Sequence, residues 1–160
     1  MTEVMPDVQS ALIPTPTITL AAASTIVDSA LAHARELGCP PMTVVLLDAG
    51  GHLQVFKRED GSGILRPQIA LAKAYGCLGM GLGGRALAER AAAHSGFYTA
   101  LTAISDGRIA PAAGGVLVRD SVGTVVGAVG ISGDKPDRDE ACAVVGIEHV
   151  GLVADTGGAS

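Results

Sequence analysis

Apolar residues recur every three or four positions between residues 20 and 37, and this spacing predicts an amphipathic helix. Thr19 precedes the first apolar position, so we expect its side chain to cap the helix N-terminus. Gly38 and the pair Pro40-Pro41 follow the last apolar position, and both residue types commonly end helices. The pattern therefore predicts a helix whose two ends are both marked in the sequence.

The residues before this helix lack its periodicity. They include Pro14 and Pro16, which restrict the backbone to extended conformations. We therefore expect residues 1–17 to form an extended N-terminal arm. Residues 18–160 have a length typical of one domain, so a single domain is expected after the arm.

Two stretches rich in β-branched and aliphatic residues are interrupted by short turns and predict β-hairpins. The first covers residues 42–59 and turns at residues 48–51, where two glycines permit positive φ. The second covers residues 116–131 and turns near Gly123. Because a short turn can join only antiparallel neighbours, both hairpins predict antiparallel pairing.

Three more helices are expected. Pro67 suits the first turn of a helix that continues to about residue 80. Residues 85–96 predict a second helix. A last helix is expected to extend to residue 152. It should begin at a capping box, in which Asp137 accepts a hydrogen bond from the Glu140 N–H and the Glu140 side chain reaches back to Asp137.

The order of elements is helix, two strands, helices, two or more strands, helix. This order predicts an α/β sandwich with an antiparallel or mixed sheet. A doubly wound parallel sheet would need strands and helices to alternate, and they do not. The run "GMGLGG" formally matches a dinucleotide fingerprint at residues 79–84, but a helix precedes it where a strand is required, so we interpret it as helix termination.

Composition restricts the classes of partner. The formal net charge is −5 and no basic stripe is visible, so no nucleic-acid partner is expected. Apolar residues make up 48% of the chain, yet no run approaches the roughly 18 apolar residues of a membrane span. No membrane partner is therefore expected. The N-terminus lacks the pattern of a signal peptide, so a cytoplasmic location is the expectation.

The three cysteines, Cys39, Cys77 and Cys142, are odd in number and widely spaced. Neither a disulfide framework nor a thiolate metal site is expected from this spacing. The histidines also lack the spacing of a metal site. We therefore expect free, buried thiols and no structural metal.

Charged residues and two glycines are concentrated in the stretch "FKREDGSGILRPQIALAKAY", residues 56–75. Arg58, Arg66 and Lys73 carry cationic groups, and the glycine-rich turn with Asp60 leads into a helix N-terminus that favours anions. One interpretation is a cleft that holds a carboxylate or phosphate. The other is a solvated loop followed by an exposed helix face.

His94 and Tyr98 lie four residues apart. If that segment is helical, the two side chains can share a face and form a hydrogen-bonded acid–base pair. The alternative is that each is an ordinary exposed or packed side chain.

Several motifs together resemble the GlcG/HbpS family, which includes haem-binding proteins and the C-terminal domain of PduO-type corrinoid adenosyltransferases. The resemblance extends over about residues 18–153. The motifs are "VVLLDAGGHLQVFKREDGS", "IALAKAY", Gly114-Gly115 and "VVGAVGISG" followed by "DRDEACAVVG".

The resemblance implies a profilin-like sandwich with an antiparallel sheet of about five strands and helices on both sides. It also implies a homo-oligomer. Arg58, Asp60, Gly61 and Lys73 coincide with the family's shared pattern, which favours the interpretation of a cleft that binds a small anionic molecule.

Haem or a related tetrapyrrole is the ligand that the resemblance implies. Arg58, Arg66 and Lys73 would bind the propionates, and His33, His94 or a tyrosine would be the axial ligand. Only four aromatic residues are present, however, whereas haem pockets are usually aromatic.

The alternative is a cofactor-independent enzyme, an isomerase, lyase, hydratase or decarboxylase, acting on a small carboxylate-bearing metabolite. Asp60, His94 and Tyr98 are then the candidates for proton transfer. A structural module that acts only through oligomerisation is a third hypothesis.

Overall fold

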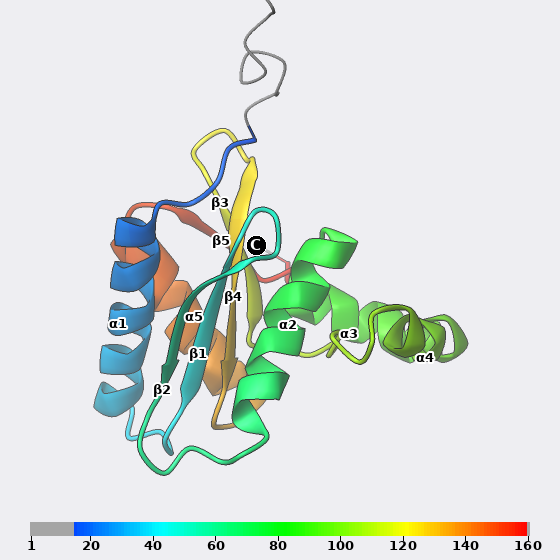
Figure 1. Cartoon of the computed structure of the whole chain (residues 1–160), viewed down its shortest axis with the longest axis horizontal. Coiled ribbons are helices and arrows are strands. Elements are labelled where there is room, and N and C mark those ends of the chain that lie inside the picture. Colours follow the sequence, from blue (N-terminus) through cyan, green and yellow to red (C-terminus); the bar gives the residue numbers. More distant parts are fainter. Residues whose placement is uncertain (1–14, 160) are drawn as a thin grey trace, which may run out of the picture.

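The computed structural model describes residues 15–159, and the greater part of the expected N-terminal arm, residues 1–14, lies outside them. The elements in chain order are α1 (Leu20–Glu36), β1 (Thr43–Asp48), β2 (Leu53–Arg58), α2 (Arg66–Met80), α3 (Gly84–Ala93), α4 (Ser95–Ile104), β3 (Gly115–Arg119), β4 (Val125–Ser132), α5 (Pro136–His149) and β5 (Val153–Asp155). Figure 1 shows α1 and α5 on one side of the sheet and α2 on the other, with α3 and α4 extending outward beside α2.

The five strands form one sheet in the order β2-β1-β4-β3-β5, and every neighbouring pair is antiparallel. This confirms the predicted fold class, a five-stranded antiparallel sheet flanked by helices. The two predicted hairpins place β2 beside β1 and β3 beside β4. The pairing of β1 with β4 joins the hairpins and leaves β2 at an edge of the sheet.

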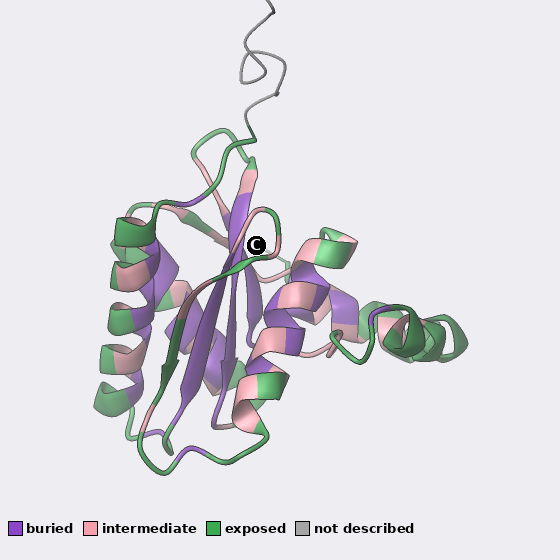
Figure 2. Cartoon of the chain, in the orientation of Figure 1, coloured by how far each residue is buried: buried purple, intermediate pink, exposed green. Residues whose placement is uncertain are grey.

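Each face of the sheet has its own apolar core, as the alternation of buried residues along the strands requires. Val44, Leu46 and Ile131 pack against α1 and α5. Val45 and Leu117 point the other way and pack against α2 and α3. Figure 2 shows the central strands buried, with exposed surface on the outer sides of α1 and on most of α4.

Several local expectations are confirmed. The Thr19 side chain accepts a hydrogen bond from the Ala22 N–H and caps α1. The first hairpin turn is held by the Asp48 carboxylate, and the second contains Gly123 with a φ of 89°. The "GMGLGG" run ends α2, because Gly81 is the left-handed C-cap of that helix.

The helix expected over residues 85–96 is wrong in extent. The structure has two consecutive helices, α3 and α4, joined at His94. The φ of −132° and ψ of 54° at His94 are not helical, so the chain changes direction there. The short strand β5 was not predicted, because its three residues are too few to show a periodic pattern.

The predicted capping box at the last helix is wrong as well. The N-cap of α5 is Lys135 and makes no side-chain capping bond, while Asp137 lies inside the first turn and pairs with Arg85 at 3.0 Å. Glu140 also pairs with Arg85, at 2.8 Å. The helix begins earlier because Pro136 has the fixed φ that suits its first position.

Within residues 15–159, the helices are all too short or too polar to cross a lipid bilayer.

Candidate functional site

The edge strand β2 is covered on one face only. On one side it packs against α1, whereas α2 packs mainly over β4, β1 and β3. Leu53 and Phe56 of β2 pair with Leu47 and Val45 of β1, and the side chains of these two β1 residues point toward α2. Leu53 is 57% exposed and Phe56 is 44% exposed. An apolar strand face therefore lies open beside α2.

This open face is one wall of a groove with a volume of about 210 Å³. Leu53 and Phe56 contribute from β2, and Pro67 and Leu71 contribute from α2. The full lining, which we call the β2–α2 groove, is Val45, Leu53, Phe56, Pro67, Gln68 and Leu71. Ligand pockets commonly measure about 300–1,000 Å³, so the groove would cover part of a larger apolar molecule.

Two arginines lie at one end of the sheet, next to this groove. Arg58 pairs with Thr43 of β1, which pairs in turn with Ser132 of β4, so the three residues form one row. The Arg58 guanidinium donates to the Ser62 carbonyl. Arg66, directly before Pro67 of the groove, donates through Nη1 to Ser132 Oγ at 3.1 Å.

Each guanidinium is therefore held by a neutral oxygen. Arg58 is exposed and Arg66 half-buried. Neither forms an ion pair with a carboxylate in the described part of the chain. Both charges thus remain available to an anion, which can accept charge-assisted hydrogen bonds from them.

Lys73 has a different environment, and the expectation that it points toward an anion in an open cleft is corrected. Its side chain is only 5% exposed, and its Nζ donates to the Ile131 carbonyl at 2.9 Å and to Asp139 at 3.1 Å. The reason is that Lys73 lies on the side of α2 that faces β4. The Lys73 charge is therefore paired in the interior and is not presented to an open cleft.

The partner of Lys73 is buried more deeply still. Burial raises the pKa of Asp139, while hydrogen bonds from the Asp134 N–H and from Lys73 act in the opposite direction. Gly114 leaves room for this pair, since a Cβ at that position would lie 2.8 Å from Lys73 Nζ. The pair is therefore a structural element between α2, α5 and β4.

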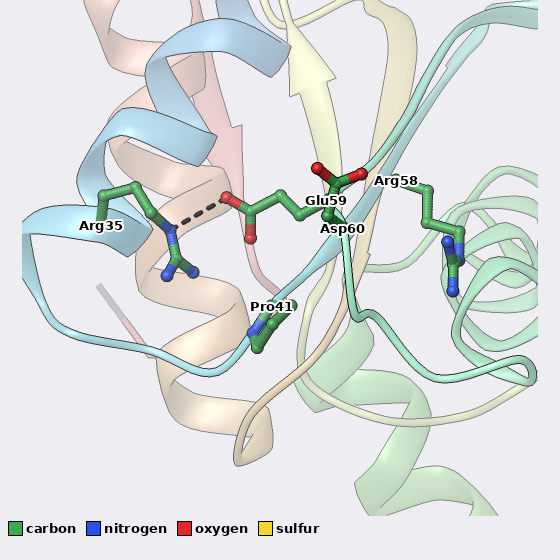
Figure 3. Close-up of a pocket in the computed structure, with 5 residues that line it drawn as sticks. All are labelled: Arg35, Pro41, Arg58, Glu59 and Asp60. Atoms are coloured by element: carbon green, nitrogen blue, oxygen red, sulfur yellow. Dashed lines mark ion pairs between the residues drawn. The ribbon is translucent and has the colours of Figure 1, made fainter.

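Arg58 and Asp60 also line a broad surface depression of about 480 Å³, together with Arg35, Pro41 and Glu59. Figure 3 shows Arg35 and Glu59 pointing toward each other across it, with Arg58 pointing away. Their ion pair measures 2.9 Å, and Glu59 also accepts from the Met42 N–H at 2.7 Å. With two carboxylates and two guanidiniums, this depression has no excess charge for an anion.

The other predicted site residues are not brought together. His33 is on α1, on the opposite face of the sheet from α2, and pairs with Glu36 at 3.3 Å. Gly61 has a φ of 83° in the loop after β2, as the turn requires. Figure 1 places the α3–α4 junction, with His94, to one side of the sheet, away from the loop that carries Asp60.

Of the two alternatives for His94 and Tyr98, the acid–base pair is not formed: among the described residues the hydrogen bond between them runs from the Tyr98 N–H to the His94 carbonyl. His94 is exposed, whereas Tyr98 is buried and packs edge-on against Phe97. The nonhelical backbone at His94 explains why the two side chains do not share a face. Asp60, His94 and Tyr98 therefore form no common proton-transfer site in this structure.

The apolar groove is not predicted by the sequence patterns described above. One pattern could have indicated it: Leu53 and Phe56 belong to an edge strand and are too apolar for an exposed face. The bulge between Leu46 and Leu47 obscured this pattern, because it shifts the register of the pairing.

The chain belongs to the HbpS-like family, which is described as haem degrading protein HbpS-like and whose model matches residues 18–148. The curated proteins include no significant match. The family assignment confirms the resemblance found in the sequence.

Solved structures of similar fold agree with this assignment. A double mutant of Streptomyces reticuli HbpS is 27% identical, with 88% of this chain and 91% of that chain covered and a TM-score of 0.75. Klebsiella pneumoniae protein ORFY is 26% identical, with coverage of 86% and 92% and a TM-score of 0.77. A PduOC:heme complex is 21% identical, with coverage of 85% and 96% and a TM-score of 0.77, and it supports the fold alone.

Proposed function

We propose that this protein binds haem or another carboxylate-bearing tetrapyrrole in the β2–α2 groove. The observation that carries the proposal is an open apolar groove with two arginines, Arg58 and Arg66, at one end. A tetrapyrrole has the matching form, an apolar ring with carboxylates along one edge. Membership in a family described by haem chemistry and the haem complex of a structural relative support the choice.

The ring would lie against Leu53, Phe56 and Leu71, whose burial provides the main favourable free energy. The carboxylates would accept hydrogen bonds from Arg58 and Arg66. Each arginine would then donate to an anion in place of its present neutral oxygen partner. Lys73 would act indirectly, because its pair with Asp139 fixes the position of α2 against the sheet. Haem, when bound, would supply redox chemistry and a ligand-binding iron.

The groove fits the ring and the carboxylates of haem, but its lining does not fit the iron. Haem iron in proteins is ligated by His, Cys, Met or Tyr, and none of the six residues that line the groove is of these types. The enzyme alternative has no comparable support, since its three candidate residues lie apart.

Titration of the purified protein with haemin, followed by the Soret band, tests the proposal. Arg58→Met and Arg66→Met should each weaken binding by about tenfold or more, because a hydrogen bond to a charged group contributes about 1.5–3 kcal/mol. Lys57→Met is the matched control, since Lys57 pairs with Asp28 on the α1 side of β2. Unchanged haemin affinity in both arginine variants would contradict the proposal.

We also propose a homo-oligomer, in which α4 takes part in the contact between subunits. α4 contains no charged residue, packs against α3, and leaves Phe97 and Ile104 56% and 74% exposed. Exposed apolar surface of this kind commonly marks a protein interface. A second subunit would also cover the side of the ligand that the groove leaves open.

The mass in solution tests this part. Wild-type protein should exceed the 15.9 kDa of one chain, and Phe97→Glu with Ile104→Glu should shift it toward the monomer. Val122→Glu is the control, because Val122 is also exposed but lies in the β3–β4 turn. A wild-type monomer would refute the oligomer.

We also propose a cytoplasmic location. The three free buried thiols support it, because disulfides are rare in the reducing cytosol.

A further inference from the structure

We infer that the β2–α2 groove recognises a tetrapyrrole by its ring and carboxylates and not by its metal, so that the metal-free macrocycle is a ligand equivalent to haem. This inference rests on the proposed function. It begins from the groove lining, in which five side chains are hydrocarbon and Gln68 contributes a neutral amide. A primary amide is not among the usual protein ligands of haem iron.

The histidine, cysteine and tyrosine side chains that could ligate haem iron do not line the groove. Every His, Cys and Tyr of the sequence falls within the described residues. The three cysteines are buried in the two cores, where burial raises the pKa of the Cys77 and Cys142 thiols to about 12. His33 and His149 belong to α1 and α5, on the face of the sheet opposite the groove.

The candidates nearest the groove in the fold are His52 and Tyr75. His52 immediately precedes Leu53, but its side chain is 81% exposed and its Nδ1 lies 3.1 Å from the Asp48 carboxylate. Tyr75 lies one helical turn beyond Leu71. Its ring lies beneath the Arg108 guanidinium, 4.4 Å from the ring centroid.

Both side chains lie at the hairpin end of the groove, while the arginines that would hold the carboxylates lie at the opposite end. Tyr75 belongs to a second, smaller depression lined by Gly51 and Leu78. A macrocycle anchored at Arg58 and Arg66 would lie over hydrocarbon, and no imidazole or phenol of the groove lining would contact the ring face that it covers. The macrocycle would thus be held without a bond between its metal and the groove.

Equilibrium titrations with haemin, protoporphyrin IX and zinc protoporphyrin test the inference. The three dissociation constants should agree within about threefold, because ring burial and carboxylate contacts are common to all three. Haemin should bind without the absorption spectrum of a histidine-ligated or tyrosinate-ligated iron. His52→Ala and Tyr75→Phe should leave all three affinities unchanged.

Haemin binding tenfold or more tighter than protoporphyrin IX, or a ligated spectrum that His52→Ala, Tyr75→Phe or His94→Ala abolishes, would overturn the inference while leaving the proposed function intact. Failure of the proposed function gives a different result: none of the three macrocycles would bind. Phe56→Glu tests whether the three macrocycles share the groove, because it should then weaken the binding of all three equally.

Discussion

The two sides of α2 differ in how closely they pack against the sheet. The side toward β4 is closed, and a Cβ at Gly130 would lie only 1.9 Å from the Ala70 carbonyl oxygen. The side toward β2 is open, and Phe56, Leu53 and Leu71 line a groove there. The comparison shows that one charged stretch of sequence supplies both a buried structural cation, Lys73, and two accessible ones, Arg58 and Arg66.

The largest expected effect is on the closed side. Lys73→Met should destabilise the fold by about 3–5 kcal/mol, because it leaves the Asp139 carboxylate buried without its cation. Chemical denaturation measures the free energy of unfolding. Lys57→Met, at a pair exposed to solvent, is the control and should change stability by less than about 1 kcal/mol. Equal effects of the two variants would show that Lys73 is not a structural cation.

Close packing on the same side gives the next effect. Gly130→Ala should destabilise by about 1–3 kcal/mol or more, because the added Cβ would collide with backbone and move α2 away from β4. Gly79→Ala is a suitable control, since Gly79 is in α2, the helix that packs against Gly130, and has open space around it. A melting temperature that Gly130→Ala leaves unchanged would contradict this account of the closed side.

The thiol of Cys77, also on the closed side, should be chemically inert. Burial raises its pKa to about 12, so at pH 8 the thiol is almost entirely protonated and the reactive thiolate is scarce. An aromatic disulfide reagent should label Cys77 rapidly in denaturant and hardly at all in the folded protein. Rapid labelling of folded protein at this residue would mean that α2 separates readily from the sheet.

The smallest effect on stability is expected on the open side. Arg58→Met should change the free energy of unfolding by less than about 1 kcal/mol, because an exposed charge contributes little to folding. The same substitution is expected to weaken haemin binding. A large loss of stability would instead assign Arg58 to the scaffold, together with Lys73.

The sequence predicts the architecture well because each element depends on local patterns. Periodicity places α1, and glycine-containing turns place both hairpins, so the antiparallel sheet follows. The α3–α4 junction could not be predicted in the same way. His94 is neither proline nor glycine, and its backbone leaves the helical region without a sequence marker.

The site could be predicted only in part, because it depends on contacts between distant residues. The arginines were recognised from their local concentration. The partner of Lys73, however, lies 66 residues further along the chain, so no local pattern shows that this cation is buried. The groove depends on where α2 crosses the sheet, which the packing of glycines such as Gly130 determines.

The central claim is that the open side of α2 is the ligand-binding surface. The most direct measurement compares the protoporphyrin IX affinity of wild-type protein with that of Phe56→Glu, with Val122→Glu as an equally drastic change at another exposed apolar position. We predict that Phe56→Glu weakens binding by about tenfold or more, because a carboxylate in the groove loses hydration when the ring binds. Val122→Glu should bind as the wild type does. Equal affinities of wild type and Phe56→Glu would contradict the account.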